Sequence, residues 1–154
     1  MTSPLASLIP HQGTMCLLER VVDWTEQSIR LTTTTHAAPD NPLRANGRLR
    51  AIHLCEYGAQ AMAVHGALKA QASGRRAPAG LLVSLRAVVL HCDYAERFAG
   101  ELHIEADCLS AGETSQQYVF RVLHAGTLLA QGRAAVMLRT INEYSGIQRT
   151  RILE

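Results

Sequence analysis

Aromatic residues are scarce in this chain, and no cluster of lysine and arginine residues is interleaved with them. Phe, Trp and Tyr make up 5% of the 154 residues, and the formal net charge is only +2. Surfaces that bind nucleic acids combine concentrated positive charge with aromatic side chains that stack on bases. We therefore expect no nucleic-acid partner.

Long uninterrupted apolar runs are absent as well. A membrane-spanning helix needs about 20 consecutive, predominantly apolar residues, so we expect no transmembrane segment. The first 13 residues lack both a basic start and a long apolar centre, so we expect no secretory signal peptide. These observations predict a cytoplasmic protein that does not associate with membranes.

The four cysteines are far apart in the sequence, at positions 16, 55, 92 and 108. No C-x-x-C pair occurs, so neither a zinc site nor a dithiol redox site is predicted. Isolated cysteines of this kind are typical of reduced, small hydrophobic residues in a cytosolic protein.

Residues 49–72 predict one long buried helix. The segment is rich in Ala, Leu, Met and Gln, which favour helices, and no proline interrupts it. It would form a rod about 36 Å long at 1.5 Å per residue. Apolar residues lie on nearly every face, which indicates burial in a protein or a membrane. Two histidines, Gln60 and Glu56 make it too polar for a bilayer, so we expect the rest of the protein to cover it.

Segments on both sides of this helix predict β-strands. Before it, residues 15–24 are apolar with spaced charges, which fits a short helical turn leading into a strand. Residues 28–36 alternate and are rich in β-branched side chains, as in a strand. After it, four further strands are expected at residues 81–92, 100–109, 115–124 and 127–138. The fold class is therefore α+β, with an antiparallel sheet wrapped around one helix. One sheet cannot cover every face of an apolar helix, so we expect a dimer.

The chain is long enough for one domain with a full core, and no linker divides it. We assign residues 1–139 to this domain. Residues 140–154 contain few apolar side chains and are expected to form a C-terminal tail.

Glu56 is the residue that does not fit a purely structural role for the helix. It is the only carboxylate between Asp40 and Asp93. Burying an unpaired carboxylate is costly, and such a group usually takes up a proton or finds a partner. A carboxyl group tuned in this way can act as a general acid or base near neutral pH. Alternatively, Glu56 reaches solvent or pairs with Arg50 or Lys69.

Three motifs carry a family resemblance. Residues 9–11 (IPH) and 15–21 (MCLLERV) form an opening motif, residues 56–60 (EYGAQ) fit E-x-x-A-Q, and residues 123–138 form a closing hairpin. Together they resemble the hot-dog 3-hydroxyacyl-[acyl-carrier-protein] dehydratases, most closely those of aryl polyene biosynthesis. The resemblance covers roughly residues 8–139 and implies a hot-dog fold, in which an antiparallel sheet wraps around one long central helix.

The resemblance implies a hydro-lyase that forms a trans-2-enoyl thioester without a metal or other cofactor. In this chain Glu56 would be the catalytic acid and His36, in the segment before the helix, the catalytic base. Gln60, one helical turn after Glu56, would orient its carboxyl group. Peptide N–H groups near Ala51, at the start of the helix, would polarise the thioester carbonyl.

Other assignments stay open at this point. His53 lies three residues before Glu56, on the same helix face, and competes with His36 as the base or lines the pocket wall. Leu82, Val83 and Leu85 are expected to line the path of the acyl chain.

The expected partners follow from the same resemblance. An acyl carrier protein would carry the substrate, and the dimer would be a homodimer or a heterodimer with another hot-dog protein. Two alternative functions remain: a hot-dog acyl thioesterase, which would not need the histidine, and a non-catalytic subunit that pairs with an active dehydratase.

Overall fold

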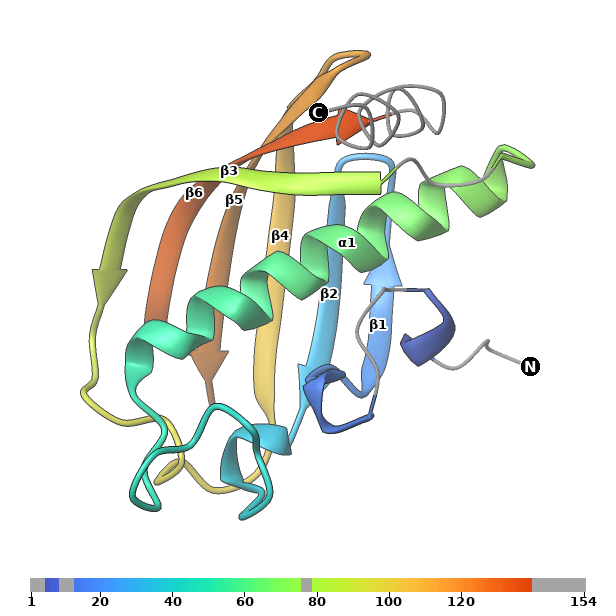
Figure 1. The fold of residues 1–154 in the computed structure, drawn as a ribbon. Helices are drawn as coiled ribbons and strands as arrows, with labels where there is room; N and C mark the ends of the chain where they lie inside the picture. The colour runs from blue at the N-terminus through green and yellow to red at the C-terminus, as the bar shows by residue number, and fades with distance from the viewer. Residues whose placement is uncertain (1–4, 9–12, 76–78, 140–154) are drawn as a thin grey trace, which may run out of the picture.

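The structure is a computed structural model that describes residues 5–8, 13–75 and 79–139. In these residues one long helix lies across a six-stranded antiparallel sheet of order β1-β2-β4-β5-β6-β3 (Figure 1). The elements are α1 (Leu54–Ala72), β1 (Arg20–Trp24), β2 (Ser28–Thr33), β3 (Ala79–Leu90), β4 (Leu102–Ala111), β5 (Ser115–His124) and β6 (Thr127–Arg139). This architecture confirms the predicted hot-dog fold. The expected tail, 140–154, lies outside the described residues.

Among the predicted boundaries that differ from the structure, two concern the segment of His36 and the start of the helix. The second strand was expected to reach His36 but ends at Thr33, and His36 lies in a short 3-10 turn, Thr35–Ala37. The strand ends because the hydroxyls of Thr33 and Thr35 both donate to the Leu17 carbonyl and turn the chain. The helix was expected from residue 49 but begins at Leu54. Arg50 has an extended backbone, and a 3-10 turn, Ala51–His53, lies between it and the helix.

The tight turns follow the local sequence chemistry. Between β5 and β6, Ala125 and Gly126 both have positive φ angles, of 48° and 80°, as the two-residue turns that join antiparallel strands require. Between β1 and β2, the Thr25 hydroxyl accepts hydrogen bonds from the N–H groups of Gln27 and Ser28. Both turns lie in the gaps between the strands that the sequence predicted, at residues 25–27 and 125–126.

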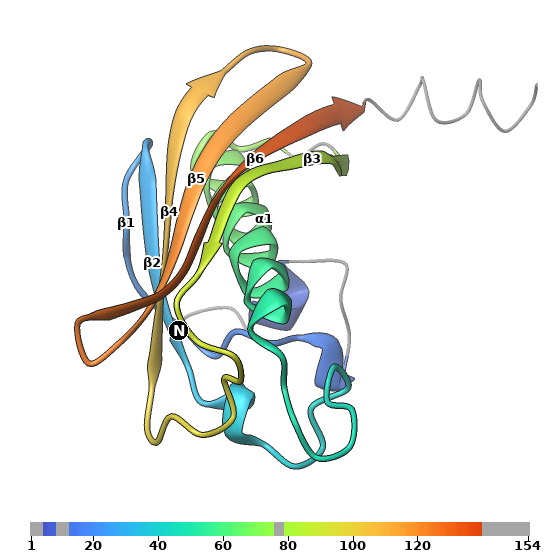
Figure 2. The same ribbon diagram turned by 90° about the vertical axis from the view of Figure 1, so that its left-hand side faces the viewer.

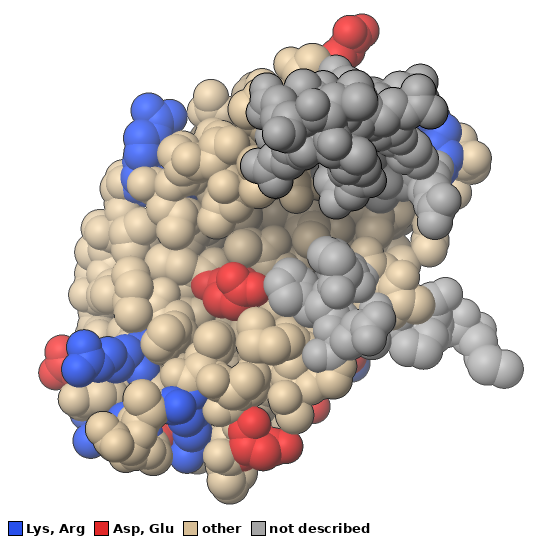
Figure 3. All heavy atoms as spheres, viewed as in Figure 1, with Lys and Arg blue, Asp and Glu red and all other residues tan. Residues whose placement is uncertain are grey.

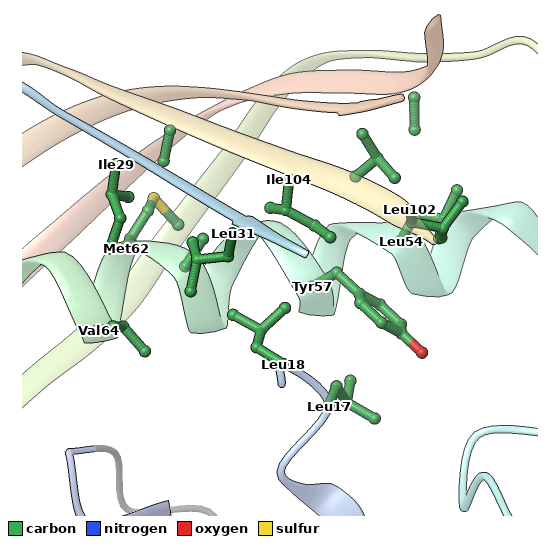
Figure 4. Packing of buried hydrophobic residues seen from close by; sticks show 14 of the residues in the cluster. Leu17, Leu18, Ile29, Leu31, Leu54, Tyr57, Met62, Val64, Leu102 and Ile104 are labelled. Atoms are coloured by element: carbon green, nitrogen blue, oxygen red, sulfur yellow. The ribbon is translucent and has the colours of Figure 1, made fainter. Parts of the chain in front are cut away.

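The helix lies on the concave side of the curved sheet, as the side view in Figure 2 shows. Leucine, isoleucine and tyrosine side chains from α1, β2 and β4 point toward one another and form the core (Figure 4). Helix and sheet meet tightly at Phe120 of β5, whose ring lies against Gly58 of α1 and Gly132 of β6. A Cβ at Gly58 would lie 2.5 Å from the Phe120 ring, so the helix can come this near only without a side chain there.

β3 is an edge strand with an unusually apolar exposed surface. It pairs only with β6, so its other side has no partner strand within the described residues. Leu81 and Val83 are 49% and 48% exposed. Exposed apolar edges of this kind are typical of surfaces that pair with another chain.

The contact between α1 and β5 predicts different effects for two glycines of the same helix. Gly58→Ala should lower the free energy of unfolding by about 1–3 kcal/mol, because the new methyl group collides with Phe120. Gly66→Ala should raise it by about 0.5–1 kcal/mol, because alanine favours helix and the site is open. Urea denaturation of both variants measures the difference. Equal effects would show that the Gly58 contact does not limit the packing.

Candidate active site

An open groove of about 910 Å³ runs along one face of α1. The helix lines it with small side chains and with Glu56, and the facing wall comes from β3, β5 and β6. This side of the molecule is largely uncharged, with a small acidic group over α1 and side chains of both charges toward the rim (Figure 3). The residues that line the groove along α1 are Glu56, Ala59, Met62, Ala63, Gly66, Ala67, Lys69 and Ala70, and those on β3 and β6 are Gly80, Leu82, Val136 and Leu138.

Glu56 is partly buried at the groove and is held by Gln60. The Gln60 side-chain amide donates to Glu56 Oε1 over 3.2 Å and to the Met15 carbonyl over 2.7 Å. Its oxygen accepts a hydrogen bond from the Leu17 N–H over 2.9 Å. Gln60 is fully buried, so these bonds hold its amide in one orientation. The predicted contact between Gln60 and Glu56 is present, and Gln60 also ties the N-terminal segment to the helix.

His36 lies away from the groove and is fully buried. Its Nε2 is 2.7 Å from the Phe98 carbonyl oxygen, which can only accept, so Nε2 carries the proton. Its Nδ1 is buried and has no hydrogen-bond partner among the residues that the structure describes. Burial lowers the pKa of His36, although the bond to Phe98 acts in the opposite direction. The imidazole is therefore neutral, as a base must be, but no hydrogen bond joins it to Glu56.

The turn that carries His36 is anchored to a different residue of the helix. The Tyr57 hydroxyl lies 2.9 Å from the Thr35 hydroxyl and accepts a hydrogen bond from the Asn41 side-chain amide over 3.0 Å. Tyr57 is fully buried and is not among the groove residues. Because neighbouring helix residues project in directions about 100° apart, Tyr57 holds the His36 turn on a different side of α1 from Glu56.

Ala51 and His53 do not contribute to the groove in the way the sequence predicted. The Ala51 N–H donates to the Asp93 carbonyl over 3.0 Å, so it is not available to a substrate carbonyl. His53 is partly exposed in the 3-10 turn before α1 and does not line the groove. The structure therefore does not support Ala51 as the carbonyl-polarising donor or His53 as part of the groove wall.

Of the three predicted acyl-chain contacts on β3, only Leu82 lines the groove. Bulges interrupt the pairing of β3 with β6 between Leu82 and Ser84 and between Arg86 and Val89. A bulge changes which face of a sheet the following side chains occupy. Leu85 consequently pairs with Ala134, nearer the start of β6, and Val83 lies within the first bulge.

The described residues contain no group of three or more His, Cys, Asp or Glu side chains that could hold a metal ion. The four cysteines are unpaired, and burial raises the pKa of Cys55. No helix among the described segments is long and apolar enough to cross a membrane.

The family of this chain follows from a match over most of its sequence. A family model described as ApeP-like, ApeP dehydratase, matches residues 3–146. The chain belongs to the ApeP-like dehydratase family. This membership confirms the resemblance to the hot-dog dehydratases that three short motifs indicated.

Solved structures share the fold of this ApeP-like chain. The dehydratase heterocomplex ApeI:P from Xenorhabdus doucetiae has a TM-score of 0.85 at 22% identity, covering 96% of this chain and 98% of that one. A hypothetical thioesterase with coenzyme A from Streptococcus pneumoniae TIGR4 has a TM-score of 0.59 at 11% identity, covering 78% and 84%. Identities this low show the fold alone. Among curated proteins, none matches this chain in sequence.

The sequence analysis missed a second buried polar pair beside the groove. His65 Nε2 is 2.7 Å from the Thr25 carbonyl, so Nε2 carries the proton and Nδ1 accepts from the Tyr118 hydroxyl over 2.7 Å. Tyr118 lines the groove, and burial raises its pKa. No local motif marks this pair, since Tyr118 is brought to His65 only by the folding of β5 onto α1. Small residues at positions 59, 63, 66 and 70 did offer a visible helical spacing for the groove face.

His36 predicts a pH dependence of stability. Its pKa in the folded protein lies below the ordinary value of 6.5, so the unfolded chain binds more protons as the pH falls below that value. The stabilisation is fully present above pH 6.5 and is lost as the pH drops toward the folded pKa. His36→Gln should therefore show a weaker loss of stability between about pH 7 and pH 5 than the wild type.

The control for this prediction is His103→Gln, at an exposed position of β4. Chemical denaturation at several pH values gives the free energy of unfolding of each protein. A slope for His36→Gln that matches those of the wild type and of His103→Gln would contradict the assigned role of the buried imidazole.

Proposed function

We propose that this chain is a subunit of a 3-hydroxyacyl-[acyl-carrier-protein] dehydratase and supplies Glu56 as the catalytic acid. The observation that carries the proposal is the position of Glu56, the only carboxylate of α1, on an otherwise apolar stretch of the groove and bonded to Gln60. Membership of the ApeP-like dehydratase family supports the reaction class. The product would be a trans-2-enoyl thioester, in fatty-acid-like or aryl polyene biosynthesis.

The reaction requires two proton transfers. A base removes a proton from C2, and the electrons of that C–H bond form the C2–C3 double bond while the C3–O bond breaks. The departing hydroxyl takes a proton from the Glu56 carboxyl group and leaves as water. The reacting carbons lie next to the thioester, so the acyl carrier protein would sit at the Glu56 end of the groove and the acyl chain would follow the small side chains of α1.

The base is not found among the described residues that line the groove. None of the described residues that line the groove is a histidine, and His36 is enclosed with its Nε2 bonded to Phe98. We propose that a second hot-dog subunit provides the base and pairs along the exposed edge of β3. Support comes from the apolar exposure of that edge and from the similar solved structure, which is that of a dehydratase heterocomplex. A homodimer is the alternative assembly.

Activity of the purified chain, alone and co-purified with a second hot-dog subunit, tests the role of Glu56. A 3-hydroxyacyl carrier protein is the substrate, and mass spectrometry follows the loss of water. Glu56→Gln should reduce the rate by about 100-fold or more, because the amide cannot deliver the proton. Glu101→Gln makes the same chemical change at an exposed surface carboxylate and should retain the wild-type rate.

The histidine variants identify the base in the same assay. His36→Ala, His53→Ala and His11→Ala, the last at a position outside the described residues, should all retain activity if the second subunit supplies the base. Loss of activity in a folded His36→Ala protein would instead assign the base to this chain. Free acid in place of the enoyl product would mean a thioesterase, and full activity of Glu56→Gln would refute the proposal.

Pairing along β3 predicts that a charge on this edge disrupts the assembly. Val83→Lys should convert a dimer into monomers, because a lysine at the paired edge would be buried without a partner. Val22→Lys, on the edge strand β1 at the opposite side of the sheet, is the matched control, since Val22 is 46% exposed against 48% for Val83. Light scattering measures the mass of each. Dissociation by Val22→Lys alone would place the interface at β1.

A further inference from the structure

The groove continues along the helix well beyond Glu56. It is lined by small helix residues as far as Ala70, about 20 Å from Glu56 at 1.5 Å per residue. Besides Glu56, the charged residues that line it are Glu26, Lys69, Arg75 and Glu113. On the facing wall, Gly80 pairs with Leu138 and Leu82 with Val136, which places these four residues together. The groove is therefore a long, mostly apolar channel with Glu56 at one end.

Gly66 leaves this channel open on the helix side. It lines the groove, and a Cβ built on it would meet no heavy atom of the described residues within 4 Å. Gly58 of the same helix, by contrast, has no room for a Cβ. A glycine inside a helix costs about 1 kcal/mol relative to alanine, and no packing contact at Gly66 requires the absence of a side chain.

We infer that Gly66 determines how long an acyl chain the groove accepts. It lies about 15 Å along the helix from Glu56, so short chains end before it and long chains must pass it. The missing side chain leaves the passage open, and a larger side chain would close it. This inference rests on the proposed function, because it takes the acyl chain of the dehydratase substrate as the occupant of the groove.

The test compares a short and a long substrate on the same variants. We expect Gly66→Leu to lower the ratio of kcat/KM for 3-hydroxyhexadecanoyl over 3-hydroxybutyryl carrier protein by about tenfold or more, because the long chain is excluded sterically. Gly66→Met, with an unbranched side chain, is a second blocking variant in case the first does not fold. Ala72→Leu adds a leucine at an exposed helix position outside the groove and should leave the ratio unchanged.

A binding measurement separates this inference from the proposed reaction. Hexadecyl and butyl thioethers of pantetheine cannot be dehydrated, so calorimetry with them reports occupancy of the groove alone. If no protein dehydrates either substrate but Gly66→Leu selectively loses the hexadecyl probe, the reaction is wrong and the length-determining role of Gly66 stands. A folded Gly66→Leu or Gly66→Met protein that keeps both the substrate ratio and the hexadecyl affinity of the wild type would overturn it.

Discussion

The structure depends on the close contact between the helix and the sheet at Phe120. The ring can lie between α1 and β6 only because residues 58 and 132 are glycines. This contact sets the rotation of the helix about its own axis, and so decides which of its faces meets the sheet. Tyr57 and Ala61 become core residues, while the face that carries Glu56, Ala59 and Ala63 is left partly uncovered. The groove is the consequence of this orientation.

The uncovered face of the helix combines two features. It is apolar enough to hold an acyl chain, and it carries the one carboxylate of the helix, fixed by a buried glutamine. His36, which the sequence favoured as the base, lies elsewhere. Its ring is bonded to the Phe98 carbonyl, and Tyr57 holds the turn that carries it. A groove with an acid but no base among its described residues is what makes a second subunit the proposed source of the base.

The sequence by itself determined the order and type of the elements and, within the site, the pair of Glu56 and Gln60 on the helix. Helix propensity and strand alternation are local properties, so the helix and the strands were predicted close to where they lie, with a two-residue gap at Ala125 and Gly126 where the structure has a turn. Glu56 and Gln60 are four residues apart on one helix, so their contact follows from helical geometry alone.

Only the tertiary structure decided the rest, because it depends on contacts between distant parts of the chain. The Ala51 N–H is taken by the Asp93 carbonyl, and His36 is enclosed by Phe98, neither of which a motif can show. Which β3 side chains face the helix depends on two bulges, which shift the alternation that a sequence pattern assumes to be regular. Long-range hydrogen bonding and strand register, rather than residue type, therefore placed the site.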